Sequence, residues 1–147
     1  MKHAPKILII EDDTNNHLLY HDAFERSGFE VTILEHADGP FTETVSSIAP
    51  DIISMDIMIG KDGVAMERDG FSAIEKLKSD SRTNTIPIIV LTNFSEESKV
   101  KRAKELGAVD FITVAGQSIK SIPEHFMRYL KEGKKYKPSH AIFRYND

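Results

Sequence analysis

The segment Lys6-Ile-Leu-Ile-Ile-Glu11-Asp12-Asp13 decides the fold class, because it joins a short apolar run directly to three acidic residues. Apolar side chains on successive residues are typical of a strand buried on both faces, as strands of a parallel sheet are. The run is too short for a signal peptide or for a membrane span, which needs roughly 20 apolar residues. We therefore expect an α/β protein, located in the cytoplasm, whose first strand ends at a group of carboxylates.

Four further apolar segments follow, separated by longer amphipathic ones. The predicted strands are Lys6–Ile10, Glu30–Leu34, Ile52–Asp56, Ile88–Leu91 and Asp110–Val114. The predicted helices are Asn15–Ser27, Phe41–Ile48, Phe71–Lys78, Glu96–Leu106 and Ser121–Lys131. Alternating strands and helices with right-handed crossovers predict a flavodoxin-like, doubly wound parallel sheet of five strands in the order 2-1-3-4-5, with helices on both faces.

Local signals also predict details of two helices. Gly28 should end the first helix, and Ser95 should be the N-cap of the fourth. From helical periodicity, we expect the inward face of the first helix to consist of Leu18, Leu19, Ala23 and Phe24.

Composition limits the function further. The chain has 147 residues, of which 40% are hydrophobic and 29% charged, values typical of one globular domain. The formal net charge is -4, so no overall positive field favours nucleic acid or an anionic membrane. The absence of cysteine excludes disulfides and thiolate chemistry.

Acidic and hydroxyl side chains lie at the carboxyl ends of three predicted strands, which meet at one edge of a doubly wound sheet. Glu11 and Asp12 follow the first strand, Asp56 ends the third and Thr92 follows the fourth. Crowded carboxylates repel one another unless a cation neutralises them, and Mg²⁺ or Mn²⁺ prefers such oxygen ligands. For Asp13 we favour a helix N-cap instead. Taken singly, Asp56 would be a solvated turn residue and Thr92 a cap or loop residue.

Five segments in order resemble the receiver domains of two-component response regulators, over about residues 6–130. They are Lys6-Ile-Leu-Ile-Ile-Glu11-Asp12-Asp13, Pro50-Asp51-Ile-Ile-Ser-Met-Asp56-Ile-Met58, Asp69-Gly70-Phe71-Ser-Ala-Ile74, Ile86-Pro87-Ile-Ile-Val-Leu-Thr92 and Leu106-Gly107-Ala108-Val-Asp110-Phe111. The resemblance implies one receiver domain over residues 1–147, with a core of about 6–130 and an extension of 131–147.

The resemblance also implies the site. Asp56 would be the phosphoryl acceptor. Asp12, Asp56 and the backbone carbonyl of Met58 would bind Mg²⁺ or Mn²⁺ directly, and Glu11 would bind it through water. Thr92 would be the switch hydroxyl that contacts the phosphoryl group, and Phe111 would occupy the aromatic switch position.

Partners follow from the same resemblance. The phosphoryl group would come from a histidine kinase or a phosphotransfer protein in a phosphorelay. The output would be binding to a protein partner, through the face formed by Glu96–Leu106, the fifth strand and the last helix. We expect a signalling phosphoprotein rather than an enzyme, a monomer or weak homodimer, with no nucleic-acid or membrane partner.

Two features depart from the family. Val114-Ala115 stands where the family has lysine followed by proline. Either Lys61 or Lys120 replaces the missing cation, or the chain is a pseudo-receiver, an interaction module without a phosphate switch. The segment 59–68 is longer than the family's loop, and it is either a surface insertion or a functional loop, which would be a lid or a partner contact.

Two alternatives are less favoured. An aspartyl-phosphate phosphatase would need a second Asp two residues after its nucleophile, and Met58 stands there. Basic and aromatic residues in Lys131–Asp147 suggest a nucleic-acid contact. We favour a strand or flap that packs on the domain, because the chain as a whole is acidic.

Overall fold

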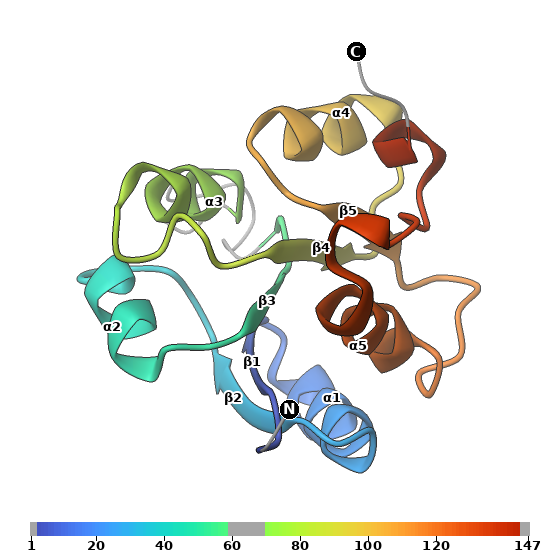
Figure 1. Cartoon of the computed structure of the whole chain (residues 1–147), viewed down its shortest axis with the longest axis horizontal. Coiled ribbons are helices and arrows are strands. Elements are labelled where there is room, and N and C mark those ends of the chain that lie inside the picture. The colour runs from blue at the N-terminus through green and yellow to red at the C-terminus, as the bar shows by residue number, and fades with distance from the viewer. Residues whose placement is uncertain (1–2, 59–69, 145–147) are drawn as a thin grey trace.

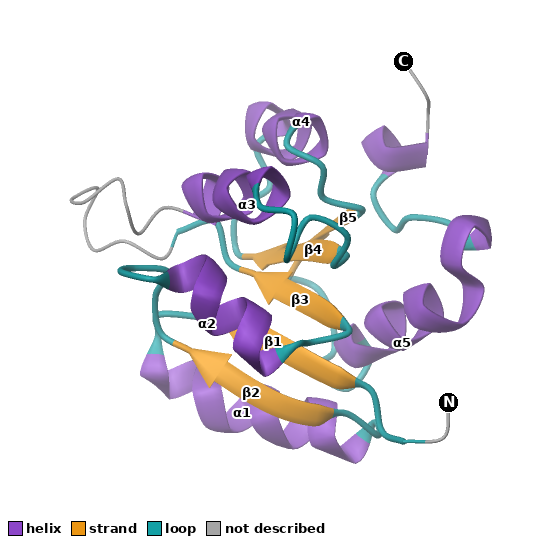
Figure 2. Cartoon of the chain, turned by 60° about the vertical axis from the view of Figure 1, so that its left-hand side comes forward, coloured by secondary structure: helices purple, strands orange, loops and turns teal. Residues whose placement is uncertain are grey.

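The chain forms one parallel sheet flanked by helices, in a computed structural model that describes residues 3–58 and 70–144 (Figure 1). The five strands are paired in the order β2-β1-β3-β4-β5, so the predicted fold class and topology are confirmed. Figure 2 shows the strands as neighbouring arrows with helices on either side. The strands are β1 (Lys6–Ile10), β2 (Glu30–Leu34), β3 (Ile52–Met55), β4 (Ile88–Thr92) and β5 (Asp110–Thr113).

Helices follow each strand. They are α1 (Thr14–Arg26), α2 (Phe41–Ile48), α3 (Gly70–Ser79), α4 (Glu97–Glu105) and α5 (Ile122–Glu132), with two 3-10 turns, η2 (Gly133–Lys135) and η3 (Ala141–Arg144), after α5. None of the described helices has the length and apolar content needed to cross a bilayer.

Two apolar clusters lie on opposite faces of the sheet because successive strand residues point to opposite sides. In β1, Leu8 and Ile10 join residues of α2, α3 and α4 in a cluster that we call the α2–α4 cluster. Ile7 and Ile9 join residues of the two helices α1 and α5 in a second cluster, which we call the α1–α5 cluster. Each of these four side chains is at most 1% exposed. A strand buried on both faces has to be apolar at every position, which explains the continuous run from Ile7 to Ile10.

Two expectations about the helices were wrong. Leu18 and Leu19 are 79% and 57% exposed, and the inward face of α1 consists of Tyr20, Ala23 and Phe24. These three share the i, i+3, i+4 spacing, which turns Leu18 and Leu19 toward solvent. The N-cap of α4 is Glu96 rather than Ser95, and its side chain makes no capping hydrogen bond.

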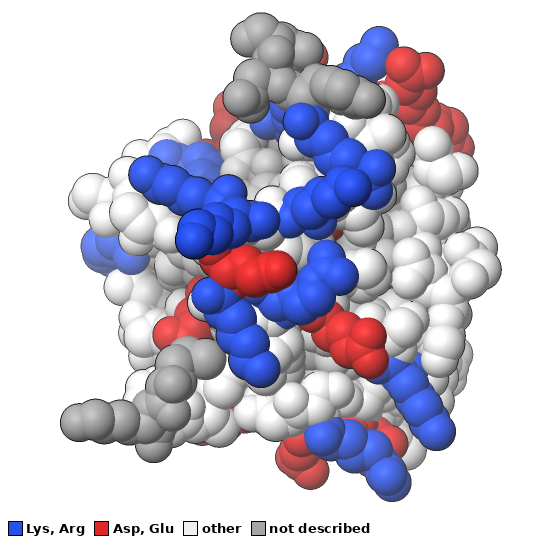
Figure 3. All heavy atoms as spheres, turned by 45° about the vertical axis from the view of Figure 1, so that its right-hand side comes forward, with Lys and Arg blue, Asp and Glu red and all other residues white. Residues whose placement is uncertain are grey.

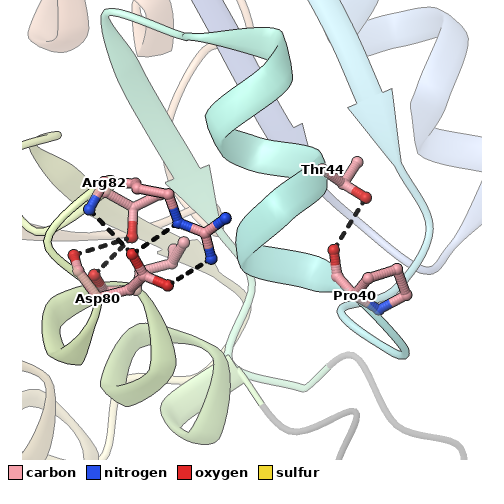
Figure 4. A network of polar contacts seen from close by, with 6 residues as sticks. Pro40, Thr44, Asp80 and Arg82 are labelled. Atoms are coloured by element: carbon pink, nitrogen blue, oxygen red, sulfur yellow. Dashed lines mark hydrogen bonds and ion pairs between the residues drawn. The ribbon is translucent and has the colours of Figure 1, made fainter.

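A turn after α3 is fixed by charge-assisted hydrogen bonds. The Arg82 guanidinium donates to both carboxylate oxygens of Asp80, at 3.0 and 2.7 Å, and lowers the pKa of Asp80 to about 2 (Figure 4). The facing first turn of α2 is closed by the Thr44 hydroxyl, which donates to the Pro40 carbonyl at 3.0 Å. Polar contacts thus order the ends of α2 and α3 that lie outside the core.

The segment after α5 packs on the domain rather than extending from it. Tyr136 is 6% exposed, and Ile142 and Phe143 pack against the α2–α4 cluster. Its cationic side chains face outward, and with α5 they line a hollow of about 450 Å³ that includes Arg128, Lys135, Lys137 and Arg144. Figure 3 faces this side and shows Lys and Arg side chains gathered there. The aromatic residues are used in packing, which supports the packed flap over nucleic-acid stacking.

Candidate functional site

Three carboxylates meet at the carboxyl ends of β1 and β3, as predicted. Glu11, Asp12 and Asp56 each place one carboxylate oxygen within 4.8 Å of the others. The two strands are adjacent, with Ile10 paired to Met55, and the backbone N–H of Asp56 donates to the Ile10 carbonyl at 3.1 Å. The parallel register therefore sets the separation of the acidic side chains.

Glu11 is the buried member of this group, at 5% exposure. Burial is the main cause that raises its pKa to about 8, and the charge of Asp56 and a hydrogen bond with Asp56 raise it further. The Asp13 N–H and the Asn16 amide donate to its oxygens at 3.2 and 3.4 Å and lower the pKa only in part. Without a cation, burial and the Asp56 charge therefore favour the protonated form of Glu11.

Asp13 lies beside the group but has a different role. Its side chain is the N-cap of α1 and accepts from the Asn15 N–H at 3.0 Å. The interpretation of Asp13 as a helix cap is confirmed, and its carboxylate is exposed.

Two donors besides Glu11 hold Asp56. Its Oδ1 accepts from the Thr92 hydroxyl at 3.1 Å and from the Met58 N–H at 3.0 Å. Thr92 ends β4 and is only 2% exposed, so its hydroxyl cannot turn to bulk water. The structure thus brings together Glu11, Asp12, Asp56, Met58 and Thr92.

Phe111 lies away from the carboxylates. It is 1% exposed and belongs to the α2–α4 cluster. Its backbone pairs with Val90, two residues before Thr92 in β4. Phe111 is therefore linked to Glu11, Asp12 and Asp56 indirectly, through the β4–β5 pair.

Val114 supplies no charge at the end of β5. It is partly buried against the α1–α5 cluster. No described Lys or Arg is among the groups that set the pKa of Glu11. Lys120 is exposed, and Lys61 and the segment 59–68 lie outside the described residues.

Asp69-Gly70 resembles the turn that opens the third helix of the family, but the contacts that Gly70 and His17 make at the site were not predicted. Gly70 opens α3 so close to β3 that a Cβ there would lie 2.2 Å from the Asp56 carbonyl oxygen. The His17 ring donates from Nε2 to the Glu11 carbonyl at 2.6 Å. Asp-Gly before a helix was a usable signal for Gly70, but nothing local in the sequence indicates that His17 reaches back to Glu11.

The donor set suits a hard divalent cation. Carboxylate oxygens that lie close together, one of them with a raised pKa, are stabilised when Mg²⁺ or Mn²⁺ replaces the proton. Such a cation would offset the repulsion between these carboxylates and the anionic oxygens of a phosphoryl group, so the arrangement is suited to phosphoryl transfer.

Comparison with known proteins agrees with this geometry. A family model described as the response regulator receiver domain matches residues 7–116. The chain is 31% identical over 110 residues to the DNA-binding dual master transcriptional regulator RpaA of Synechocystis, covering 74% of this chain and 42% of RpaA. It is 29% identical over 107 residues to the polar-differentiation response regulator DivK of Brucella ovis, covering 73% of this chain and 81% of DivK.

A solved receiver-domain structure is also similar to this chain. The signal receiver domain of a signal transduction histidine kinase from Syntrophus aciditrophicus superposes with a TM-score of 0.68 at 28% identity, covering 90% of this chain and 94% of that domain. The similarity to RpaA is confined to less than half of that protein's length.

Proposed function

This chain belongs to the response regulator receiver family, and we propose that Asp56 is its phosphoryl acceptor. The observation that carries the proposal is the Asp56 carboxylate, which lies beside Glu11 and Asp12 and accepts a hydrogen bond from the buried Thr92 hydroxyl. The donor would be the phosphohistidine of a histidine kinase or a phosphotransfer protein.

The proposed step is an in-line displacement at phosphorus. A carboxylate oxygen of Asp56 forms a bond to phosphorus as the P–N bond of the phosphohistidine breaks. The electron pair of that bond stays on the imidazole, which takes up a proton, and Asp56 becomes an acyl phosphate. The transfer involves no oxidation or reduction, so it needs no redox cofactor.

Divalent-metal binding is part of the proposal. Asp12, Asp56 and the Met58 carbonyl would hold Mg²⁺ or Mn²⁺ directly, and Glu11 would do so through water. The bound cation supplies positive charge to the phosphoryl oxygens. The raised pKa of Glu11 supports this assignment, because burial and the neighbouring Asp56 charge both disfavour its ionised form, and a cation would offset that cost.

Thr92 and Phe111 would carry the signal away from Asp56. The Thr92 hydroxyl already reaches Asp56, and it would donate to a phosphoryl oxygen once the acyl phosphate forms. Phe111 would then move toward the space beside β4. This bistable arrangement couples a local charge to a change on β5, and the output is binding to a protein partner.

Val114 favours one alternative function. It places an apolar side chain where the family has a lysine, and that side chain packs against the α1–α5 cluster. A pseudo-receiver would use the same fold as a permanent interaction module and would accept no phosphoryl group.

Small-molecule phosphodonors distinguish the two functions. We expect acetyl phosphate or phosphoramidate with Mg²⁺ to add one phosphoryl group, seen in the intact mass and removed by hydroxylamine. Asp56→Asn should abolish the addition and Asp13→Asn should not, because Asp13 caps α1. Absence of labelling in the wild type, or equal labelling of Asp56→Asn, would exclude Asp56 as acceptor and favour the pseudo-receiver.

A further inference from the structure

Residues 133–144, called the C-terminal strap here, lie against β5. This strand is at the edge of the sheet, with β4 as its only sheet neighbour among the described strands. In Figure 1 the strap passes beside β5 and ends near α4. An edge strand presents unpaired backbone groups and is commonly covered. Asp110, Phe111 and Ile112 are nevertheless at most 1% exposed.

The strap is anchored on the buried carboxylate of Asp110. This carboxylate accepts from the Tyr136 hydroxyl at 2.5 Å and from the backbone N–H groups of Ser139 and His140 at 2.8 and 3.2 Å. It also accepts from the N–H of Phe111 at 2.8 Å. A buried carboxylate requires such donors, so strap and strand depend on each other.

Further contacts close the strap onto α4 and onto itself. The Lys104 ammonium in α4 donates to the Ile142 carbonyl at 3.0 Å. Arg144 donates to the carbonyls of Pro138 and Ser139 at 2.8 and 3.0 Å. The strap is therefore an ordered element built for this surface.

Phe111 joins the strap to the candidate site. Its ring centroid lies 6.0 Å from that of His140, in an edge-to-face arrangement. Its N–H and that of His140 share one oxygen of Asp110. On the other side, β5 pairs with β4, where Thr92 faces Thr113 and donates to Asp56.

We propose that the strap is an intramolecular cover of the α4–β5–α5 surface and that phosphorylation of Asp56 loosens it. When Thr92 turns to the phosphoryl group, Phe111 moves into the space beside β4 and withdraws from His140. The strap then keeps only part of its contacts, and a protein partner competes with it for β5. This inference rests on the proposed function, since it requires an acyl phosphate or its mimic at Asp56.

The amides of Ser139 and His140 report directly on the strap, because both donate to Asp110. Their hydrogen exchange would be followed by NMR with Mg²⁺ alone and with Mg²⁺ plus beryllofluoride, an acyl-phosphate mimic. We expect exchange to become roughly tenfold faster with beryllofluoride in the wild type. In Asp56→Asn it should not change.

A substitution in the strap tests the coupling from the other end. Tyr136→Phe removes one hydrogen bond to Asp110 and should speed exchange at both amides without beryllofluoride. Because coupling is reciprocal, it should also tighten beryllofluoride binding, by up to roughly tenfold. Tyr129→Phe is the matched control, because the Tyr129 ring stacks edge-on against Tyr136 but its hydroxyl does not bind Asp110.

The possible outcomes distinguish failure of the strap inference from failure of the acceptor assignment at Asp56. If beryllofluoride shifts the signals around Asp56 and Thr92 while exchange at Ser139 and His140 stays constant, the strap inference is wrong and the acceptor assignment stands. If beryllofluoride shifts no signals, both are wrong. If Tyr136→Phe loosens the strap without changing beryllofluoride affinity, the two sites are not coupled and the inference is overturned.

Discussion

The Thr92 hydroxyl donates a hydrogen bond of 3.1 Å to Oδ1 of Asp56, from the end of β4 to the residue that follows β3. The same oxygen accepts from the Met58 N–H at 3.0 Å. Both contacts orient the candidate acceptor before any phosphoryl group arrives. The bond from Thr92 is partly buried and ends on a carboxylate, which makes it stronger than an average side-chain hydrogen bond.

Loss of this hydrogen bond should lower the stability of the fold. We expect Thr92→Val to lower the free energy of unfolding by about 2 kcal/mol, because it leaves a carboxylate without one donor. Thr113→Val is the matched control, since Thr113 donates to the neutral Phe94 carbonyl at 3.2 Å, and it should cost about 1 kcal/mol. Urea unfolding measures both, and an equal or reversed order would contradict the assigned contact.

Gly70 is required by the close approach of α3 to β3. In Gly70→Ala the new Cβ would lie 2.2 Å from the Asp56 carbonyl oxygen and 2.5 Å from the Ile57 Cα, so backbone has to move. We expect a loss of about 3 kcal/mol in stability and weaker Mg²⁺ binding. Gly39→Ala is the control, because no atom lies within 4 Å of a Cβ built there. Its positive φ of +62° alone should lower the free energy of unfolding, by about 1 kcal/mol. Similar losses for the two variants would contradict this packing.

Glu11 should make metal-free stability depend on pH. Its pKa in the folded protein is about 8, above the ordinary value of 4.5, so the folded state binds the proton more tightly than the unfolded state. Its contribution is therefore complete below pH 4.5 and is lost as the pH rises through 8, with a slope of up to about 1.4 kcal/mol per pH unit. Urea unfolding between these pH values, without divalent cations, should show stability falling in wild type and a flatter profile in Glu11→Gln.

Glu30→Gln, at an exposed position of β2, should leave that profile unchanged. Mg²⁺ should stabilise the wild type more at pH 8 than at pH 6, because at the higher pH fewer protons compete for the carboxylates. Equal stabilisation at both pH values would contradict the assignment of Glu11 to the metal site.

Val114→Lys should improve phosphorylation by returning a cation to the end of β5. We expect labelling by acetyl phosphate to become roughly tenfold faster, since an ammonium a few ångströms from the phosphoryl oxygens contributes more than the 1.4 kcal/mol that this factor needs. Val114→Met, similar in length but uncharged, should leave the rate unchanged. Equal rates in the two variants would show that charge at position 114 does not limit the reaction.

The fold was predictable because burial leaves a clear pattern in this sequence. The runs Ile7–Ile10 and Ile88–Leu91 have no polar residue, as strands covered on both faces require. The positions of Glu11, Asp12 and Asp56 followed in turn, because strand ends converge in a doubly wound sheet. The raised pKa of Glu11 did not follow from the sequence, since it depends on burial that only the structure provides.

Other features depend on contacts between distant residues. Leu18 and Leu19 are as apolar as Ala23, so hydrophobicity alone does not separate the inward face of α1 from its outward face. Packing of Tyr20 and Phe24 against the sheet sets the rotation of α1 about its axis, and this turns Leu18 and Leu19 toward solvent. From the sequence, Asp110 is simply the first residue of a predicted strand. Its role as the acceptor for Tyr136 and Ser139 depends on the fold, which brings these distant residues onto it.

The acceptor assignment is tested most directly by amide NMR spectra of the protein alone, with Mg²⁺, and with Mg²⁺ plus beryllofluoride. We predict that Mg²⁺ shifts residues around Asp12 and Asp56, and that beryllofluoride then moves Thr92 and Phe111 in the wild type but not in Asp56→Asn. Spectra that neither addition changes, or identical changes in Asp56→Asn, would contradict a phosphoryl acceptor at Asp56.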